Sequence, residues 1–198
     1  MKSLRIALWL LVAIAAAVAL ILYAGQQGQE ARDQKALASA FGGDFALLDG
    51  AGKTVTNDSL KGKPFAIFFG FTRCPDVCPT SLQRMARLRG QLGADGDKFA
   101  IVFVSVDPEH DTPKQVADYV ALFNTPIIGL SGDQEAINKA VKAYKVYVKK
   151  VPTNNGQDYT IDHTAAIYLM DKDGGFAGTI THEENDKVAL EKLQRLVS

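Results

Sequence analysis

The sequence predicts an α/β domain in which a mixed sheet is flanked by helices, with an N-terminal hairpin and one N-terminal transmembrane helix. Three observations support this prediction. An uncharged apolar run covers residues 6–24. Continuous apolar segments of strand length then alternate with segments that carry apolar residues at helical spacing. Two short strand-like runs around a turn precede these segments, and two more follow them, which is typical of hairpins.

The apolar run at the N-terminus is long enough to cross a bilayer, because a helix rises about 1.5 Å per residue and the hydrocarbon core is about 30 Å thick. A cleaved signal peptide is the alternative, since Lys2 and Arg5 form a basic start, but its apolar part normally runs only about 7–15 residues. The same basic residues keep the N-terminus cytoplasmic by the positive-inside rule. We therefore expect an uncleaved single-pass protein of the bacterial inner membrane, with its C-terminal domain in the periplasm.

The chain is expected to divide into three parts: a membrane anchor (residues 1–24), a tether rich in Gln, Ala and Gly (25–43) and a folded domain (44–198). The 22 Lys and Arg residues are balanced by 22 Asp and Glu residues. Nothing indicates a nucleic-acid partner, which needs a basic patch. The two cysteines are too few for a disulfide scaffold, so they are either a local redox pair or metal ligands.

The folded domain is expected to open with a hairpin at residues 45–48 and 53–56, around a turn that contains glycine. Residues 64–71 form a continuous apolar run, which is typical of a central strand buried on both faces. Residues 80–92 carry leucines and a methionine at helical spacing. Pro79 suits a first helical position, where its missing N–H is not needed.

The middle of the domain continues the alternation of strands and helices. Residues 99–106 are expected to form the second buried strand. Thr112 and Gln115 then form a capping box, which predicts a helix with one apolar face. Residues 127–130 are predicted as a short strand and residues 133–144 as another amphipathic helix.

The end of the domain is expected to be a hairpin followed by a helix. Residues 164–170 and 176–181 are the predicted strands, joined by a turn at 171–174, and residues 185–197 are the last helix. Alternating strands and helices followed by a hairpin and a helix are the order of a thioredoxin-like domain. Such a domain has a mixed sheet with helices on both faces.

Both cysteines lie where the first buried strand gives way to a helix. The N-terminus of a helix stabilises a thiolate over a thiol, so Cys74 and Cys78 should be reactive. Each precedes a proline, which disfavours the α conformation and holds the segment as a fixed loop. Two thiolates on one stiff loop can bind a soft metal ion or join as a disulfide, acting as a redox pair. The sequence leaves both roles open.

A third ligand candidate is His163, at the start of the strand that enters the C-terminal hairpin. In a thioredoxin-like sheet, the loop before that strand lies beside the junction that carries the cysteines. A Cys₂His set suits Cu(I), Cu(II) or Zn(II), although a lone histidine is more often a satisfied or exposed residue. The other histidines, His110 and His182, are expected to be solvated. Arg73 and Asp76 could tune the site electrostatically, but a solvated loop face is the favoured interpretation.

Four segments of the chain, in order, resemble the Sco/SenC family. They are residues 71–79 with the CxxxC-Pro element, 104–113 with an Asp-Pro-Glu turn, 128–132, and 162–174 with an Asp-His pair. The resemblance runs from about Phe45 to the C-terminus. The CxxxC-Pro element with the distant Asp-His pair is its most specific part. One departure is His110, where relatives commonly carry Arg or Lys.

The resemblance implies a thioredoxin-like domain on one membrane span that binds copper, as Cu(I) or Cu(II), through Cys74, Cys78 and His163. The family assists assembly of the dinuclear copper centre of cytochrome c oxidase. It acts as a copper donor, as a thiol-disulfide reductase for that centre's cysteines, or both. The implied partner is cytochrome c oxidase subunit II or another copper-receiving protein.

A thiol-disulfide oxidoreductase or peroxidase-type enzyme on the same fold is the alternative function. Thioredoxin-type enzymes place two residues between their cysteines, whereas three separate Cys74 from Cys78. They also carry a proline just before the later strand, whereas none follows Pro152 here. A zinc-stabilised domain is disfavoured because structural zinc usually takes four protein ligands and only three candidates are visible. A metallochaperone is favoured, with thiol-disulfide activity left open.

Overall fold

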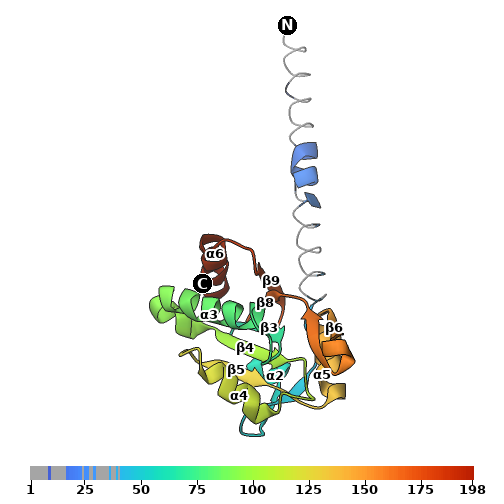
Figure 1. Cartoon of the computed structure of the whole chain (residues 1–198). Helices are drawn as coiled ribbons and strands as arrows, with labels where there is room; N and C mark the ends of the chain where they lie inside the picture. Colours follow the sequence, from blue (N-terminus) through green and yellow to red (C-terminus); the bar gives the residue numbers. More distant parts are fainter. Residues whose placement is uncertain are drawn as a thin grey trace. The chain divides into compact units, whose positions relative to one another are not determined.

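A computed structural model of the chain (Figure 1) describes residues 41–198 throughout and, before them, residues 9, 17–23, 25, 26, 29, 36 and 39. Phe41–Ser198 form one compact unit. Most of the predicted membrane span at residues 6–24 lies outside the described residues. Within the described part, no helix is both long and apolar enough to cross a membrane. The division into anchor, tether and domain stays a prediction.

A five-stranded mixed sheet forms the centre of the unit, in the order β5-β4-β3-β8-β9. The central strand β3 is parallel to β4 and antiparallel to β8, and all of its residues are buried. This confirms the predicted mixed sheet. Its strands are β3 (Phe65–Gly70), β4 (Ala100–Ser105), β5 (Ile127–Leu130), β8 (Ala166–Met170) and β9 (Phe176–Thr181).

The remaining elements surround this sheet (Figure 1). Two antiparallel hairpins form separate two-stranded sheets: β1 (Ala46–Leu48) with β2 (Thr54–Thr56), and β6 (Val148–Thr153) with β7 (Asp158–His163). The helices are α2 (Asn57–Leu60), α3 (Val77–Gln91), α4 (Pro113–Ala121), α5 (Gln134–Ala143) and α6 (Asp186–Val197), with short 3-10 turns η1 (Gly93–Lys98) and η2 (Asn154–Gly156).

Helices cover both faces of the sheet, as predicted. Successive side chains of a strand point to opposite faces. Phe69 of β3 packs against Tyr144 at the end of α5, with ring centroids 5.2 Å apart. Its neighbour Phe68 packs against Phe103 of β4, which in turn packs against Tyr119 of α4. The helices α4 and α5 therefore lie on opposite faces.

The predicted capping box at the start of α4 is present. The side chain of Thr112 accepts a hydrogen bond from the backbone N–H of Gln115, and the side chain of Gln115 accepts one from the backbone N–H of Thr112. Two unpaired N–H groups at the helix start are thereby satisfied.

The β6–β7 hairpin is absent from the sequence prediction. Strand β6 contains two lysines and Pro152, which weaken a strand signal. Among the described strands it pairs only with β7, at the edge of no larger sheet, so a long apolar run is not needed. His163, expected at the start of the strand that enters the C-terminal hairpin, is instead the last residue of β7.

Helix α3 begins earlier than the sequence predicted. Its first residue is Val77 rather than Pro79, so Cys78 lies inside its first turn and Pro79 is its third residue. A proline is tolerated there because the first N–H groups of a helix have no intrahelical acceptor. The prediction that Pro79 keeps Cys78 out of the helical conformation is wrong.

Candidate metal centre

Cys74, Cys78 and His163 lie together at one end of the central strand. Cys74 is in the loop after β3, Cys78 is in the first turn of α3, and His163 ends β7. One ligand atom from each, two sulfurs and a ring nitrogen, all lie within 4.8 Å of one another. The Sγ atom of Cys78 is 3.5 Å from Nε2 of His163. The backbone N–H of Cys78 donates to Sγ of Cys74 at 3.4 Å.

The sulfur of Cys78 is enclosed by the end of β3. Cys78 is buried, whereas Cys74 is partly exposed. A Cβ atom on Gly70 would lie only 2.7 Å from Sγ of Cys78 and 2.9 Å from Cε2 of Phe103. Glycine is therefore required at the last position of β3, because any side chain there would displace the sulfur.

The ring of His163 is oriented by its neighbours. Its Nδ1 atom lies 3.1 Å from the carbonyl oxygen of Thr164, which accepts a hydrogen bond when Nδ1 carries the proton. That tautomer leaves the lone pair on Nε2, the atom that faces Cys78, which is the usual arrangement for a metal-binding histidine. The rings of Phe68 and Phe71 pack edge-on against the imidazole, with centroids 6.0 and 5.9 Å away.

The two cysteines differ in protonation. The thiol of Cys78 donates a hydrogen bond to Cys74, and this bond, with the nearby side chain of His163 and hydrogen bonds from backbone N–H groups, lowers the pKa of Cys74 to about 3 against the opposing effect of burial. The same hydrogen bond and burial raise the pKa of Cys78. The more exposed sulfur is thus a thiolate at neutral pH, and the buried sulfur is a thiol.

This donor set suits a soft or borderline ion. Thiolates select Cu(I), and imidazole suits copper and zinc. Among the described residues the metal-binding group contains three members, whereas structural zinc sites almost always have four protein ligands. The residues present therefore fit copper.

A buried carboxylate fixes the loop that leads to Cys74. The side chain of Asp111 is almost fully buried. It accepts hydrogen bonds from the backbone N–H and the hydroxyl of Thr72, at 2.9 and 2.5 Å, and from the hydroxyl of Ser105 at 2.5 Å. Sequence reasoning missed this role. The only signal is that Asp111 belongs to the 104–113 segment, and no local pattern reveals a contact that spans 39 residues.

Arg73 and His110 are exposed, as predicted, but their side chains also contact neighbouring polar groups. Arg73 lies 3.3 Å from Asp107 and 3.1 Å from Asp158, and its guanidinium is 3.0 Å from Nδ1 of His110. The hydroxyl of Tyr159 donates to Asp107 at 2.6 Å. Asp107 itself is fully buried. These side chains form a polar cluster next to the cysteine loop.

Asp76 and His182 are exposed, as predicted. The Asp76 carboxylate accepts a hydrogen bond from the hydroxyl of Thr80.

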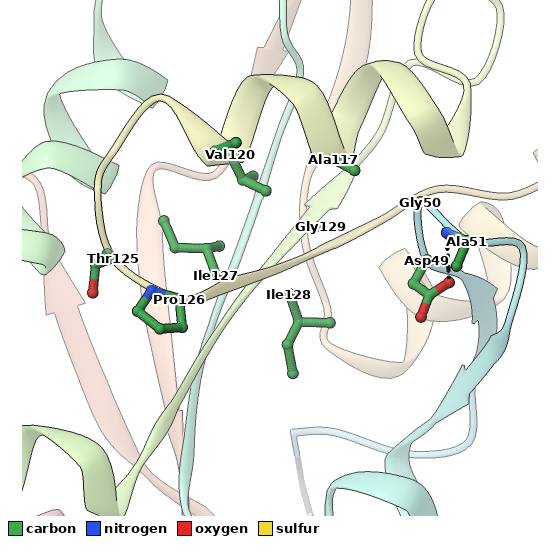
Figure 2. Close-up of a pocket in the computed structure, with 11 residues that line it drawn as sticks. Asp49, Gly50, Ala51, Ala117, Val120, Thr125, Pro126, Ile127, Ile128 and Gly129 are labelled. Carbon is green, nitrogen blue, oxygen red and sulfur yellow. Dashed lines mark hydrogen bonds between the residues drawn. The ribbon is translucent and has the colours of Figure 1, made fainter.

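A groove of about 510 Å³ lies elsewhere on the domain (Figure 2). It runs between α4, β5 and the turn after β1, where Val120, Ile128 and Asp49 line it. None of the described residues that line it is a cysteine or histidine.

Similar sequences come from one family. The SCO1/SenC family model matches residues 33–198. The mouse mitochondrial protein SCO2 homolog is 35% identical over 175 residues, which cover 87% of this chain and 68% of the mouse protein. The Saccharomyces cerevisiae mitochondrial protein SCO2 is 37% identical over 174 residues, 85% of this chain and 57% of the yeast protein. The chain thus spans between about half and two thirds of these relatives.

Solved structures are similar over most of the domain. Copper-bound ScoI from Bradyrhizobium japonicum is 50% identical, with a TM-score of 0.72 over 79% of this chain and 99% of that one. Copper-bound yeast Sco1 is 34% identical, with a TM-score of 0.72 over 80% and 88%. BsSco, a member of the Sco family of cytochrome c oxidase assembly proteins with an identified disulfide switch, is 26% identical, with a TM-score of 0.61 over 80% and 94%. The fold is thioredoxin-like, and the chain belongs to the SCO1/SenC family.

Proposed function

We propose that this chain is a membrane-anchored copper-binding protein that assists assembly of the dinuclear copper centre of cytochrome c oxidase. Cys74, Cys78 and His163 are the proposed ligands. The observation that carries the proposal is the convergence of two sulfur atoms and one imidazole nitrogen within 4.8 Å. The copper bound in the related structures from Bradyrhizobium japonicum and yeast supports it.

The same two cysteines serve either of two activities. As ligands they hold copper, as Cu(I) or Cu(II), for delivery. As a redox pair, the Cys74 thiolate attacks a disulfide of the partner and forms a mixed disulfide, which Cys78 resolves after losing its proton. That sequence reduces the partner's disulfide to two thiols and oxidises Cys74 and Cys78 to one disulfide. The low pKa of Cys74 supports this second activity, and a thiol-disulfide oxidoreductase without a metal role is the second candidate.

The proposed recipient is cytochrome c oxidase subunit II or another copper-receiving protein. We assign residues 1–24 to a membrane anchor, 25–43 to a tether and 44–198 to a periplasmic domain. The uncharged run at residues 6–24 supports the anchor. The relatives include a SCO1/SenC family lipoprotein from Bacillus anthracis and mitochondrial Sco proteins, which is consistent with membrane association.

Metal analysis of the whole purified chain, with and without reductant and alongside a free-thiol count, tests the proposal. Reduced protein is expected to hold an equimolar amount of copper, and oxidised protein is expected to hold almost none. The double variant Cys74→Ser, Cys78→Ser is the control and should resemble the oxidised protein. Equal copper in thiol-blocked and reduced samples would contradict ligation by the cysteines. A reversible disulfide without any copper binding would favour the second candidate.

A further inference from the structure

The hairpin that carries His163 is held to the domain without strand pairing. Within the part of the chain that the structure describes, β6 and β7 pair only with each other. At the base of the hairpin, Thr164 and Tyr147 exchange two hydrogen bonds. An isolated two-stranded hairpin is marginally stable in water. The position of its far end must therefore come from side chains.

One face of β7 links the far end of the hairpin to the metal centre. Side chains alternate along a strand, so Tyr159, Ile161 and His163 point to the same side. Ile161 is buried, and His163 reaches Cys78. Tyr159 is roughly 13 Å further along the strand, at about 3.3 Å per residue. A contact at Tyr159 thus fixes the angle at which His163 meets the cysteines.

The side-chain contacts at that far end converge on the segment next to Cys74 and on the end of β4. The hydroxyl of Tyr159 donates to Asp107 at 2.6 Å and lies 2.9 Å from a carboxylate oxygen of Glu109. Arg73 pairs with Asp158 at 3.1 Å and with Asp107 at 3.3 Å. The guanidinium of Arg73 also lies 5.2 Å from the centre of the Tyr159 ring.

The contacts of Arg73 and Tyr159 meet at the carboxylate of Asp107. Asp107 is fully buried and follows β4, whose partner strand β3 leads to the cysteine loop. A buried carboxylate needs a charge partner and hydrogen-bond donors. Arg73 supplies the charge and Tyr159 a donor, while His110 lies 3.1 Å away. Loss of either Arg73 or Tyr159 leaves Asp107 under-satisfied, so the contacts act as a unit.

We propose that Arg73, Asp107 and Tyr159 are positioning residues that clamp the β6–β7 hairpin against the cysteine loop and keep His163 within reach of Cys78. The effect of these contacts on copper binding rests on the proposed function, whereas the contacts themselves are present in the metal-free protein. We call these three residues the hairpin clamp. It connects the residue next to Cys74 with the strand that ends in His163.

Hydrogen exchange of the whole metal-free chain tests the clamp directly. Tyr159→Phe keeps the ring and removes only the hydroxyl. It should speed hydrogen exchange of the β6 and β7 amides about tenfold, which is the order of effect expected when one hydrogen bond to a charged group is lost. Exchange of the β3 and β4 amides should not change. Tyr147→Phe is the matched control, because Tyr147 is exposed and its hydroxyl bonds to no described residue. It should leave exchange unaltered.

Release of Cu(II) to a chelator separates positioning of His163 from a general loss of stability. Tyr159→Phe should speed release about tenfold, because the open hairpin takes His163 away from the metal. In a His163→Ala background the same substitution should have no effect, since there is no ligand left to position. Arg73→Lys keeps a positive charge beside Cys74 but cannot pair with Asp107 and Asp158 at once, so it should resemble Tyr159→Phe.

Unchanged exchange in both Tyr159→Phe and Arg73→Lys would overturn the clamp. An acceleration that persists in the His163→Ala background would show that these residues only stabilise the fold. If the parent chain binds no copper, the proposed function fails, yet the exchange measurement still decides whether the hairpin is clamped.

Discussion

Nε2 of His163 lies 3.5 Å from Sγ of Cys78, although 85 residues separate them along the chain. This contact joins the end of a two-stranded hairpin to the first turn of α3. Because Cys74 and Cys78 belong to one segment and His163 to another, copper binding should depend on two properties that can be changed separately. One is the redox state of the thiols, and the other is the position of the hairpin.

Oxidation of the thiols should abolish most of the Cu(I) affinity. A Cys74–Cys78 disulfide removes both sulfur donors and leaves His163 alone, which cannot hold soft Cu(I) tightly. The measurement is anaerobic competition with a Cu(I) chelator, before and after oxidation, with re-reduction as the control. Affinity that is equal in oxidised and reduced protein would show that neither sulfur is a ligand.

Cys74 should react with iodoacetamide even in acid. Its pKa of about 3 means that the thiolate is present above that pH and is lost as the pH falls through it. At pH 5 an ordinary cysteine would have about three orders of magnitude less thiolate. Mass spectrometry of the metal-free chain should therefore find Cys74 alkylated quickly at pH 5, and Cys78 unmodified.

Cys78→Ala provides the control for that experiment. It removes the hydrogen bond that contributes most to the low pKa of Cys74. The pKa of Cys74 should then rise and its alkylation at pH 5 should slow. Alkylation at an unchanged rate would mean that the thiol of Cys78 does not stabilise the thiolate.

Gly70→Ala should disturb the centre although it adds only one methyl group. The new Cβ would lie 2.7 Å from Sγ of Cys78 and 2.9 Å from the Phe103 ring, so one of them must move. Overpacking of this kind costs about 1–3 kcal/mol of the free energy of unfolding, and copper binding should weaken. Denaturant unfolding and chelator competition measure the two effects.

Gly90→Ala is the matched substitution. Gly90 lies in α3, and apart from the adjoining backbone of that helix no described atom lies within 4 Å of the added Cβ. Alanine there should raise the free energy of unfolding by about 0.5–1 kcal/mol. The account of Gly70 would be contradicted if both substitutions behaved alike.

Asp111→Asn should destabilise the cysteine loop. The carboxylate accepts three hydrogen bonds from Thr72 and Ser105 in a buried position, and an amide cannot accept all of them with the same strength. Hydrogen bonds to a charged group are each worth about 1.5–3 kcal/mol. We expect the free energy of unfolding to fall by about 2 kcal/mol in urea titrations.

Asp118→Asn serves as the comparison for Asp111. Asp118 is exposed, and its one partner in the described part of the chain is Lys114, four residues earlier on α4. Such surface pairs contribute about 0.3–0.5 kcal/mol. A comparable loss of stability in the two variants would argue against a special role for Asp111.

The strands of the central sheet could be predicted from the sequence because they are continuous apolar runs. The start of α4 could be predicted from the capping box at Thr112. The sequence was insufficient for the β6–β7 hairpin, whose strands contain lysines and a proline and pair outside the main sheet. It also misplaced Cys78, because the local preference of a residue before proline is overridden by the packing of the helix start.

Part of the candidate site could be predicted from short sequence motifs. The spacing of Cys74 and Cys78 and the Asp-His pair at residue 163 identified the residues that the fold brings together. Asp107 and Asp111 were not assigned, since their roles come from burial and from partners far away in the chain. Arg73 is predicted to be solvated because charged loop residues usually are. Its ion pair with the buried Asp107 becomes visible only in the fold.

The most direct test of the central claim, that copper is held by Cys74, Cys78 and His163, is X-ray absorption spectroscopy of the copper-loaded chain and of its His163→Ala variant. The parent should show two sulfur donors and one imidazole nitrogen. The variant should lose the imidazole signal, keep the sulfur signal and retain Cu(I) better than Cu(II). Replacement of the exposed His182 by alanine should leave the spectrum unchanged. An imidazole contribution that survives in His163→Ala, or a parent spectrum without sulfur, would contradict the account.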